Sequence, residues 1–142
     1  MEIIKTILQY SLSYFTVMMV LVYLFNIPQL VTNDKKGLIK EYYYDNFSNV
    51  VVFDFFLIAI YLAIGLYFIQ LFKTETLLQQ TIVIILTTIL ISGGFAFYFL
   101  NTPKNKTFFS RWFYSVRYLA VVYDIILIVS VFLLNNYLKK LI

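Results

Sequence analysis

The sequence predicts an all-α integral membrane protein whose four transmembrane helices form two tandem helical hairpins related by a pseudo-two-fold axis. Three observations support this fold class. The 142 residues are 62% hydrophobic and 13% charged, whereas soluble domains average about 45–50% apolar and about 25% charged. Four apolar runs are each long enough, at about 20 residues, to cross ~30 Å of hydrocarbon. Finally, the two halves of the chain resemble each other.

The four apolar runs cover residues 7–27, 50–72, 77–100 and 118–138. Pro28 is expected to end the first helix, and Pro103 follows the third, because proline cannot continue a helix. The first run is too long for the apolar part of a signal peptide, so we expect a retained helix.

The connections differ in length. Residues 73–76 form a short turn, whereas residues 29–49 and 101–117 are long, polar and rich in aromatic side chains. Four spans place the two long segments on one face and both termini with the short turn on the other. The face with the two long segments carries seven of the 11 Lys and Arg residues. This excess of positive charge predicts that the face lies in the cytosol. Two glycosylation sequons, at Asn46 and Asn105, favour the opposite orientation.

A shift of 70 residues aligns the chain with itself without gaps. Of the 72 aligned pairs, 15 are identical, where composition alone gives about six in a search for internal repeats. The match places VVFD (51–54) on VVYD (121–124). We therefore expect a first hairpin in residues 1–72 and a second in residues 73–142, packed together as one compact membrane domain.

Each half carries one aspartate inside an apolar run, Asp54 and Asp124. A charged aspartate at the centre of a spanning helix costs about 2.5–3.5 kcal/mol, so both should point away from lipid. One interpretation is structural: each carboxylate accepts hydrogen bonds from Tyr, Thr or Ser on a neighbouring helix, or pairs with Arg117. In the other, the two carboxylates bind a proton or a cation.

The composition excludes several kinds of chemistry. The chain has no cysteine and no histidine, which excludes disulfides, Cys/His zinc sites and Ser-His or Cys-His catalysis. No metal-ligand motif or nucleophile–base set accompanies the aspartates. We expect no enzyme activity, no metal and no cofactor.

Small residues at four-residue spacing let helices approach closely. The pairs Ala59–Ala63 and Ser92–Ala96 have this spacing. The Gly93-Gly94 pair indicates close packing or a kink, with a gating hinge as the alternative.

Two aromatic-basic segments, EYYYDNF (41–47) and FFSRWFYSVRY (108–118), precede the aspartate helices. Such residues form interfacial belts at the headgroup level. They also anchor protein interfaces, and we weigh a belt against a belt that docks a partner. The candidate docking residues are Tyr42, Tyr43, Tyr44, Arg111, Trp112 and Phe113. Nucleic acid is not an expected partner, because neither segment is a recognised module.

Two stretches, FFSRWFYSVRYLAVVYDIILI (108–128) and NVVVFDFFLIAIYLAIG (49–65), resemble a family of small uncharacterised four-helix membrane proteins encoded by large DNA viruses of algae and amoebae. The resemblance covers about a third of the chain. It implies a component of the virion inner membrane, assembled in a host-derived bilayer and contacting capsid proteins. It implies no catalytic residue.

The predicted function is accordingly that of a multi-pass structural or scaffold protein. It would contact the lipid bilayer and capsid or other membrane proteins, and could form a homo-oligomer. The alternative is a small proton- or cation-coupled channel or transporter that uses Asp54 and Asp124.

Overall fold

The computed structural model describes residues 2–141, and these residues form helices and no strand. The helices are α1 (Glu2–Val17), η1 (Met18–Leu24), α2 (Ile27–Thr32), α3 (Leu38–Lys40), η2 (Glu41–Asp45), α4 (Phe47–Leu71), α5 (Leu77–Leu100), α6 (Phe108–Val116) and α7 (Leu119–Leu141). The segments η1 and η2 are wider, π-type turns. The all-helical prediction is confirmed.

Four helical stretches are long and apolar enough to cross a membrane, as expected. They are Glu2–Leu24, Phe47–Leu71, Leu77–Leu100 and Leu119–Leu141. The third matches its predicted bounds, and the second and fourth differ by up to three residues at an end. The first begins five residues before the predicted span, because its polar first turn is helical as well.

The end of the first long helix differs from the prediction. The helix stops at Leu24, and Asn26 adopts a left-handed conformation with φ 51°. Pro28 lies in the first turn of α2 instead of ending the first helix. A proline suits that position, because its missing N–H has no helical partner there in any case.

The turn between α4 and α5 is set by local chemistry. Lys73 takes a left-handed conformation with φ 53°. Thr76 then caps α5: its hydroxyl accepts from the Gln79 N–H, and the Gln79 side chain accepts from the Thr76 N–H. This reciprocal pair satisfies two donors that a helix start leaves free.

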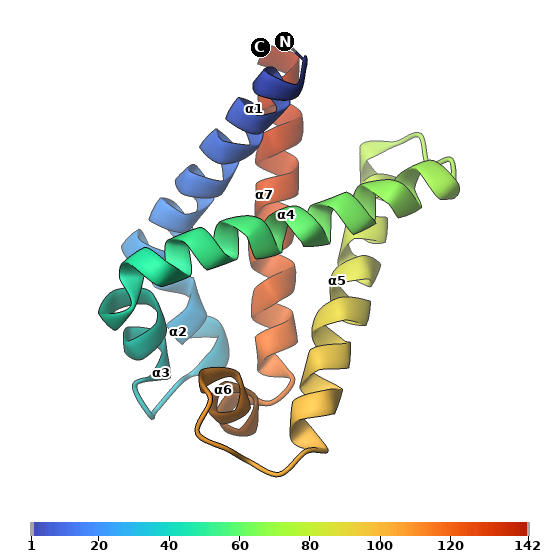
Figure 1. Cartoon of the computed structure of the whole chain (residues 1–142). Helices are drawn as coiled ribbons and strands as arrows, with labels where there is room; N and C mark the ends of the chain where they lie inside the picture. The colour runs from blue at the N-terminus through green and yellow to red at the C-terminus, as the bar shows by residue number, and fades with distance from the viewer. Residues whose placement is uncertain (1, 142) are drawn as a thin grey trace.

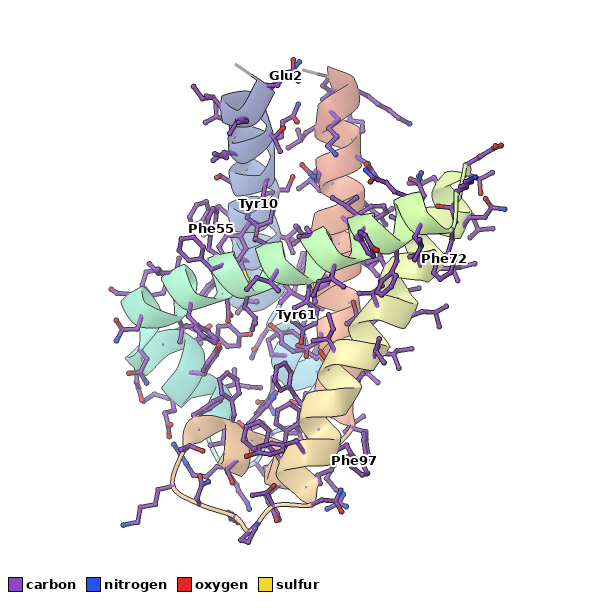
Figure 2. The ribbon with its side chains drawn as sticks, turned by 45° about the vertical axis from the view of Figure 1, so that its right-hand side comes forward. Glu2, Tyr10, Phe55, Tyr61, Phe72 and Phe97 are labelled. Carbon is purple, nitrogen blue, oxygen red and sulfur yellow. The ribbon has the colours of Figure 1, made fainter. Side chains whose placement is uncertain are left out.

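Figure 1 shows both ends of the chain at one end of the molecule and α2, α3 and α6 toward the other. Helix α7 lies between α1 and α5 and packs against both. Helix α4 crosses these helices steeply, and it does so in the view of Figure 2 as well. It packs mainly against α5.

The expected pairing of α1 with α4 along their length is therefore not seen. The two helices meet locally, where the hydroxyl groups of Tyr10 and Tyr14 donate to the backbone carbonyls of Phe55 and Val51 at 2.5 and 2.7 Å. The rings of Tyr10 and Phe55 lie 5.0 Å apart (Figure 2). In the second half, α5 and α7 do pack together. The tandem-hairpin arrangement is thus not confirmed.

Helix α4 approaches α5 closely at Gly65. A Cβ atom there would lie 2.6 Å from Cδ1 of Ile84, and Ile84 is itself only 1% exposed. Ser92 and Ala96 on α5 are fully buried. Ser92 and Ala96 thus lie in the interior, as their spacing predicts.

The other small residues singled out from the sequence do not pack in this way. Ala59 is half-buried and Ala63 is exposed. A Cβ atom at Gly93 or Gly94 would meet nothing within 4 Å, and α5 continues through both. Close helix packing is thus not seen at Ala63, Gly93 or Gly94, and the assignment of Ala59 to helix packing stays a prediction.

We predict that Gly65→Val destabilises the folded protein by about 1–3 kcal/mol, since the added atoms overlap a buried side chain. Thermal unfolding in detergent measures this effect. Gly94→Val is the matched control, because it makes the same change in the same kind of helix without a neighbour. Ile84→Val removes Cδ1 and should recover part of the loss. Equal effects at Gly65 and Gly94 would contradict the close approach.

Candidate functional site: an aromatic cavity with two carboxylates

A cavity of about 220 Å³ lies among η2, α4, α5, α6 and α7. Most of its lining side chains are aromatic or aliphatic, and Asp54 and Asp124 both reach it. Neither lysine nor arginine is among the described residues that line it. The two aspartates that the sequence singled out thus share one internal space.

Asp54 is 5% exposed on α4. Its Oδ1 accepts a 2.6 Å hydrogen bond from the hydroxyl of Tyr42. Tyr42 lies in η2, one turn before α4, so the chain itself brings the donor to the carboxylate. Burial raises the pKa of Tyr42 far above its ordinary value, and the Asp54 charge raises it further. Tyr42 therefore stays protonated and can donate.

Asp124 on α7 is bound by a two-step chain of hydroxyl groups. Ser92 Oγ on α5 donates to Asp124 Oδ2 at 2.7 Å, and the hydroxyl of Tyr61 on α4 lies 2.7 Å from Ser92 Oγ. Because serine has one hydroxyl proton and gives it to Asp124, Tyr61 is the donor to Ser92. This chain links α4, α5 and α7 through polar groups.

Both carboxylates thus point inward and accept from Tyr or Ser, as the structural interpretation predicts. Arg117 is not part of the group: it is exposed at the end of α6 and pairs with neither aspartate. Its φ of 54° marks the sharp bend between α6 and α7, which directs its side chain away from the cavity.

Sequence reasoning missed two tyrosines and the polar role of Ser92, which it read as a packing residue. Tyr61 lies seven residues after Asp54, two turns along the same helical face, and that spacing could have indicated it. Tyr123 precedes Asp124, and its hydroxyl lies 2.5 Å from that of Tyr43 inside the protein. No spacing signal predicts this contact, because 80 residues separate the two rings.

Many of the residues that line the cavity occur in pairs with a constant separation along the sequence. Seven pairs of its lining residues are separated by 70 positions, the shift that aligns the two halves. These pairs are Ile39 with Phe109, Tyr42 with Trp112, Tyr43 with Phe113, Phe53 with Tyr123, Asp54 with Asp124, Leu57 with Leu127, and Ile58 with Ile128. Such a lining is expected for a cavity on a pseudo-two-fold axis.

The helices of the two halves also correspond to each other under the shift of 70 residues. Residues 38–45, which contain α3 and η2, map onto 108–115 in α6. Likewise, α4 maps onto α7, and α1 with η1 maps largely onto α5. The packing of α1 on α7 corresponds in the same way to the packing of α5 on α4.

The hydrogen-bond donors do not follow the symmetry. Tyr42 donates a hydrogen bond to Asp54, whereas Trp112, the equivalent of Tyr42, has no hydroxyl. Ser92 serves Asp124, and the equivalent of Ser92 is Val22, which is buried. Each half therefore carries one carboxylate, but the hydrogen-bond donor comes from η2 for Asp54 and from α5 for Asp124.

The candidate docking residues are mostly inside the protein. Tyr43, Trp112 and Phe113 are buried, and Tyr42 faces Asp54. Only Tyr44 is well exposed, at 50%. The predicted docking surface is wrong for these side chains, because α6 turns its aromatic face toward the cavity.

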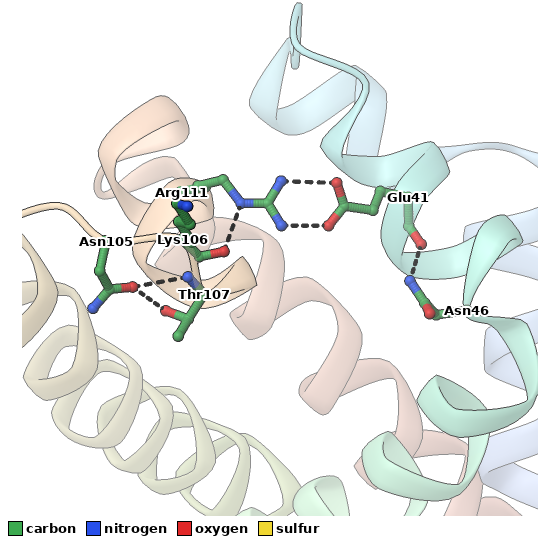
Figure 3. A network of polar contacts seen from close by, with 6 residues as sticks. All are labelled: Glu41, Asn46, Asn105, Lys106, Thr107 and Arg111. Carbon is green, nitrogen blue, oxygen red and sulfur yellow. Dashed lines mark hydrogen bonds and ion pairs between the residues drawn. The ribbon is translucent and has the colours of Figure 1, made fainter.

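Arg111, the remaining candidate, is 33% exposed and forms an ion pair with Glu41 of the same chain (Figure 3). Its two terminal nitrogens donate to the two carboxylate oxygens of Glu41 at 2.8 and 2.5 Å. Glu41 and Arg111 are also 70 residues apart. This bidentate pair holds α6 against η2 at the rim of the cavity.

The two sequon asparagines also make local contacts in this region (Figure 3). Asn46 donates to the carbonyl of Glu41, and Asn105 accepts from the backbone and hydroxyl of Thr107. Within residues 2–141, no group of three or more Asp, Glu, His or Cys side chains is arranged to hold a metal ion.

The chain matches no protein-family model, and neither a curated protein nor a solved structure is significantly similar to it. The resemblance to viral membrane proteins therefore stays a prediction.

We predict that Tyr42→Phe lowers the free energy of unfolding by about 1–3 kcal/mol, because it removes the donor to a buried carboxylate and leaves the ring in place. Equilibrium unfolding in detergent measures it. Tyr44→Phe is the control: the same hydroxyl is removed from a neighbouring, exposed ring. A similar effect of both changes would mean that the Asp54 contact does not stabilise the fold.

The Glu41–Arg111 pair should make stability depend on pH. The hydrogen bonds from Arg111 lower the pKa of Glu41 below its ordinary value of 4.5. A group with a lowered pKa stabilises the fold above its ordinary pKa and loses this contribution as the pH falls through the lowered value. The wild type should therefore have a higher melting temperature than Glu41→Gln at pH 7, and the difference should shrink toward zero as the pH falls through the lowered pKa of Glu41, below 4.5.

Melting curves of both proteins between neutral and acidic pH measure this difference. Asp45→Asn is the control, because the Asp45–Lys40 pair is 3.4 Å long and its side chains are 54% and 76% exposed. Such a pair contributes little. A difference between wild type and Glu41→Gln that does not change with pH would contradict the assignment.

Proposed function

We propose that the protein is a multi-pass membrane protein that binds a proton or a cation between Asp54 and Asp124. One observation carries the proposal: both carboxylates line one cavity, and no basic side chain of the described residues lines it with them. Inside membranes, acidic residues without a basic partner mark ion and proton sites. The class of function is that of a small proton- or cation-coupled channel or transporter.

Membrane insertion is supported by the surface of the long helices. Large apolar side chains on α1, α4, α5 and α7 are exposed, among them Leu78, Leu90 and Phe97 at 64–72%. Such a surface would be unfavourable in water and suits lipid. The end with α2, α3 and α6 carries most of the basic side chains, so we place it in the cytosol.

A structural role is the second candidate, and the Tyr61–Ser92–Asp124 chain favours it. These hydroxyl and carboxylate groups join three helices, as expected for polar ties in a scaffold. A place in a virion inner membrane, or a contact with capsid proteins, stays a prediction. The docking surface on which this prediction rests is reduced, because five of the six candidate docking side chains are buried, face the cavity or pair with another residue of the chain.

Flux through reconstituted vesicles separates the two candidates. We expect vesicles with the wild type to dissipate a proton or potassium gradient faster than empty vesicles, and vesicles with Asp54→Asn plus Asp124→Asn to be as tight as empty ones. Asparagine keeps the shape and removes the charge. Asp45→Asn, an exposed aspartate in η2, is the control and should keep full flux.

The melting temperature of the double variant completes the test. If wild-type and variant vesicles lose the gradient at the same rate and the variant melts at a lower temperature, ion handling is rejected. The structural role is then supported.

A further inference from the structure

We propose that the cavity binds an organic ammonium ion, with its charge between Asp54 and Asp124 and its carbon atoms against the aromatic walls. The proposal rests on the function proposed above and names the ligand class of the same site. The ligand is a small amine or quaternary ammonium compound. Four properties of the cavity support it.

The first property is charge. Two carboxylates share a mostly apolar space, and each accepts one hydrogen bond from a described side chain, at one of its two oxygens. Arg111, which precedes the lining residue Trp112 in α6, has both terminal nitrogens on Glu41. Buried charges need a partner, and here the described residues supply none. A positive ligand would complete the site.

The second property is the nature of the walls. The rings of Trp112, Tyr42, Phe99 and Tyr123 are among those that line the cavity. Aromatic faces attract cations, and quaternary ammonium groups are recognised by cages of such rings. Because these groups are weakly hydrated and carry carbon atoms, the same walls also bury their apolar surface.

The third property is the small number of oxygen ligands, which does not suit a bare metal ion. Calcium takes six to eight oxygen ligands, and magnesium keeps a shell of oxygens as well. The polar groups that reach this cavity are the two carboxylates and a few hydroxyls already engaged with each other. The donor set therefore favours an ion that carries its own apolar shell.

The fourth property is size. The volume of about 220 Å³ is roughly seven times the share of one water molecule in the liquid. This corresponds to a ligand of roughly seven or more non-hydrogen atoms, the size of choline. The lining includes both carboxylates, one on α4 and one on α7, and in our proposal one positive charge lies between them.

The chain contains its own reporter. Trp112 is the one tryptophan in the sequence, it lines the cavity, and its ring stacks on Phe108 at 6.0 Å. A ligand in the cavity should change its fluorescence. We would titrate the full chain in nanodiscs with choline, with 3,3-dimethylbutan-1-ol and with potassium chloride. The alcohol has the shape of choline without the charge.

We expect choline to give a saturable change of Trp112 fluorescence, and neither the alcohol nor potassium to give one at the same concentrations. Asp124→Asn should weaken choline binding by about tenfold or more, since it removes a charge next to the ligand. Asp45→Asn is the matched control and should bind as the wild type does. The comparison of choline with the alcohol uses the wild type alone, so it does not depend on the folding of a variant.

The other outcomes overturn the inference in different ways. An equal response to the alcohol would show an apolar cavity that does not select charge. A response to potassium that equals the response to choline would reject an organic ligand and leave the proposed ion handling in place. If none of the three gives a saturable change, the ammonium site is rejected. The vesicle flux with protons or potassium still decides the broader function separately.

Discussion

The placement of two carboxylates in one mostly apolar cavity is the constraint on which the interior of this protein depends. Asp54 lies at 5% exposure among rings and aliphatic side chains, where an unpaired charge would cost several kcal/mol. Hydroxyl groups offset part of this cost: Tyr42 on η2 donates to Asp54, and Ser92 on α5, with Tyr61 of α4 behind it, donates to Asp124. These contacts link α4, α5 and α7 around the cavity.

The two acidic groups of the cavity are separated by 70 residues, the shift that aligns the two halves of the sequence. Lining residues 70 positions apart meet around one space, and Glu41 and Arg111, also 70 apart, close its rim. Such an arrangement is expected of two copies around an axis, in which equivalent residues approach each other. The equivalent residues 41 and 111 differ in charge. An acidic and a basic residue at equivalent positions attract each other, which identical residues could not do.

Particular residues show how far the sequence could be read. The inward direction of Asp54 and Asp124 was predictable, because lipid excludes charge. The roles of Arg111, Trp112 and Phe113 were not, because the same aromatic and basic residues suit a lipid belt, a docking surface or a cavity wall. Their role depends on the rotation of α6, which contacts the preceding helix α5 and, 70 residues away, η2.

The sequence by itself determined the helical class, the four long apolar helices and the equivalence of the two halves. These properties follow from local composition and period, which a single chain displays directly. Only the tertiary structure decided that α4 crosses its neighbours, that Gly65 and not Gly93 or Gly94 lies at the close contact, and that Arg117 stays outside while Ser92 binds Asp124. The physical reason is that these facts depend on which helix faces meet, and residues far apart in the chain choose those faces together.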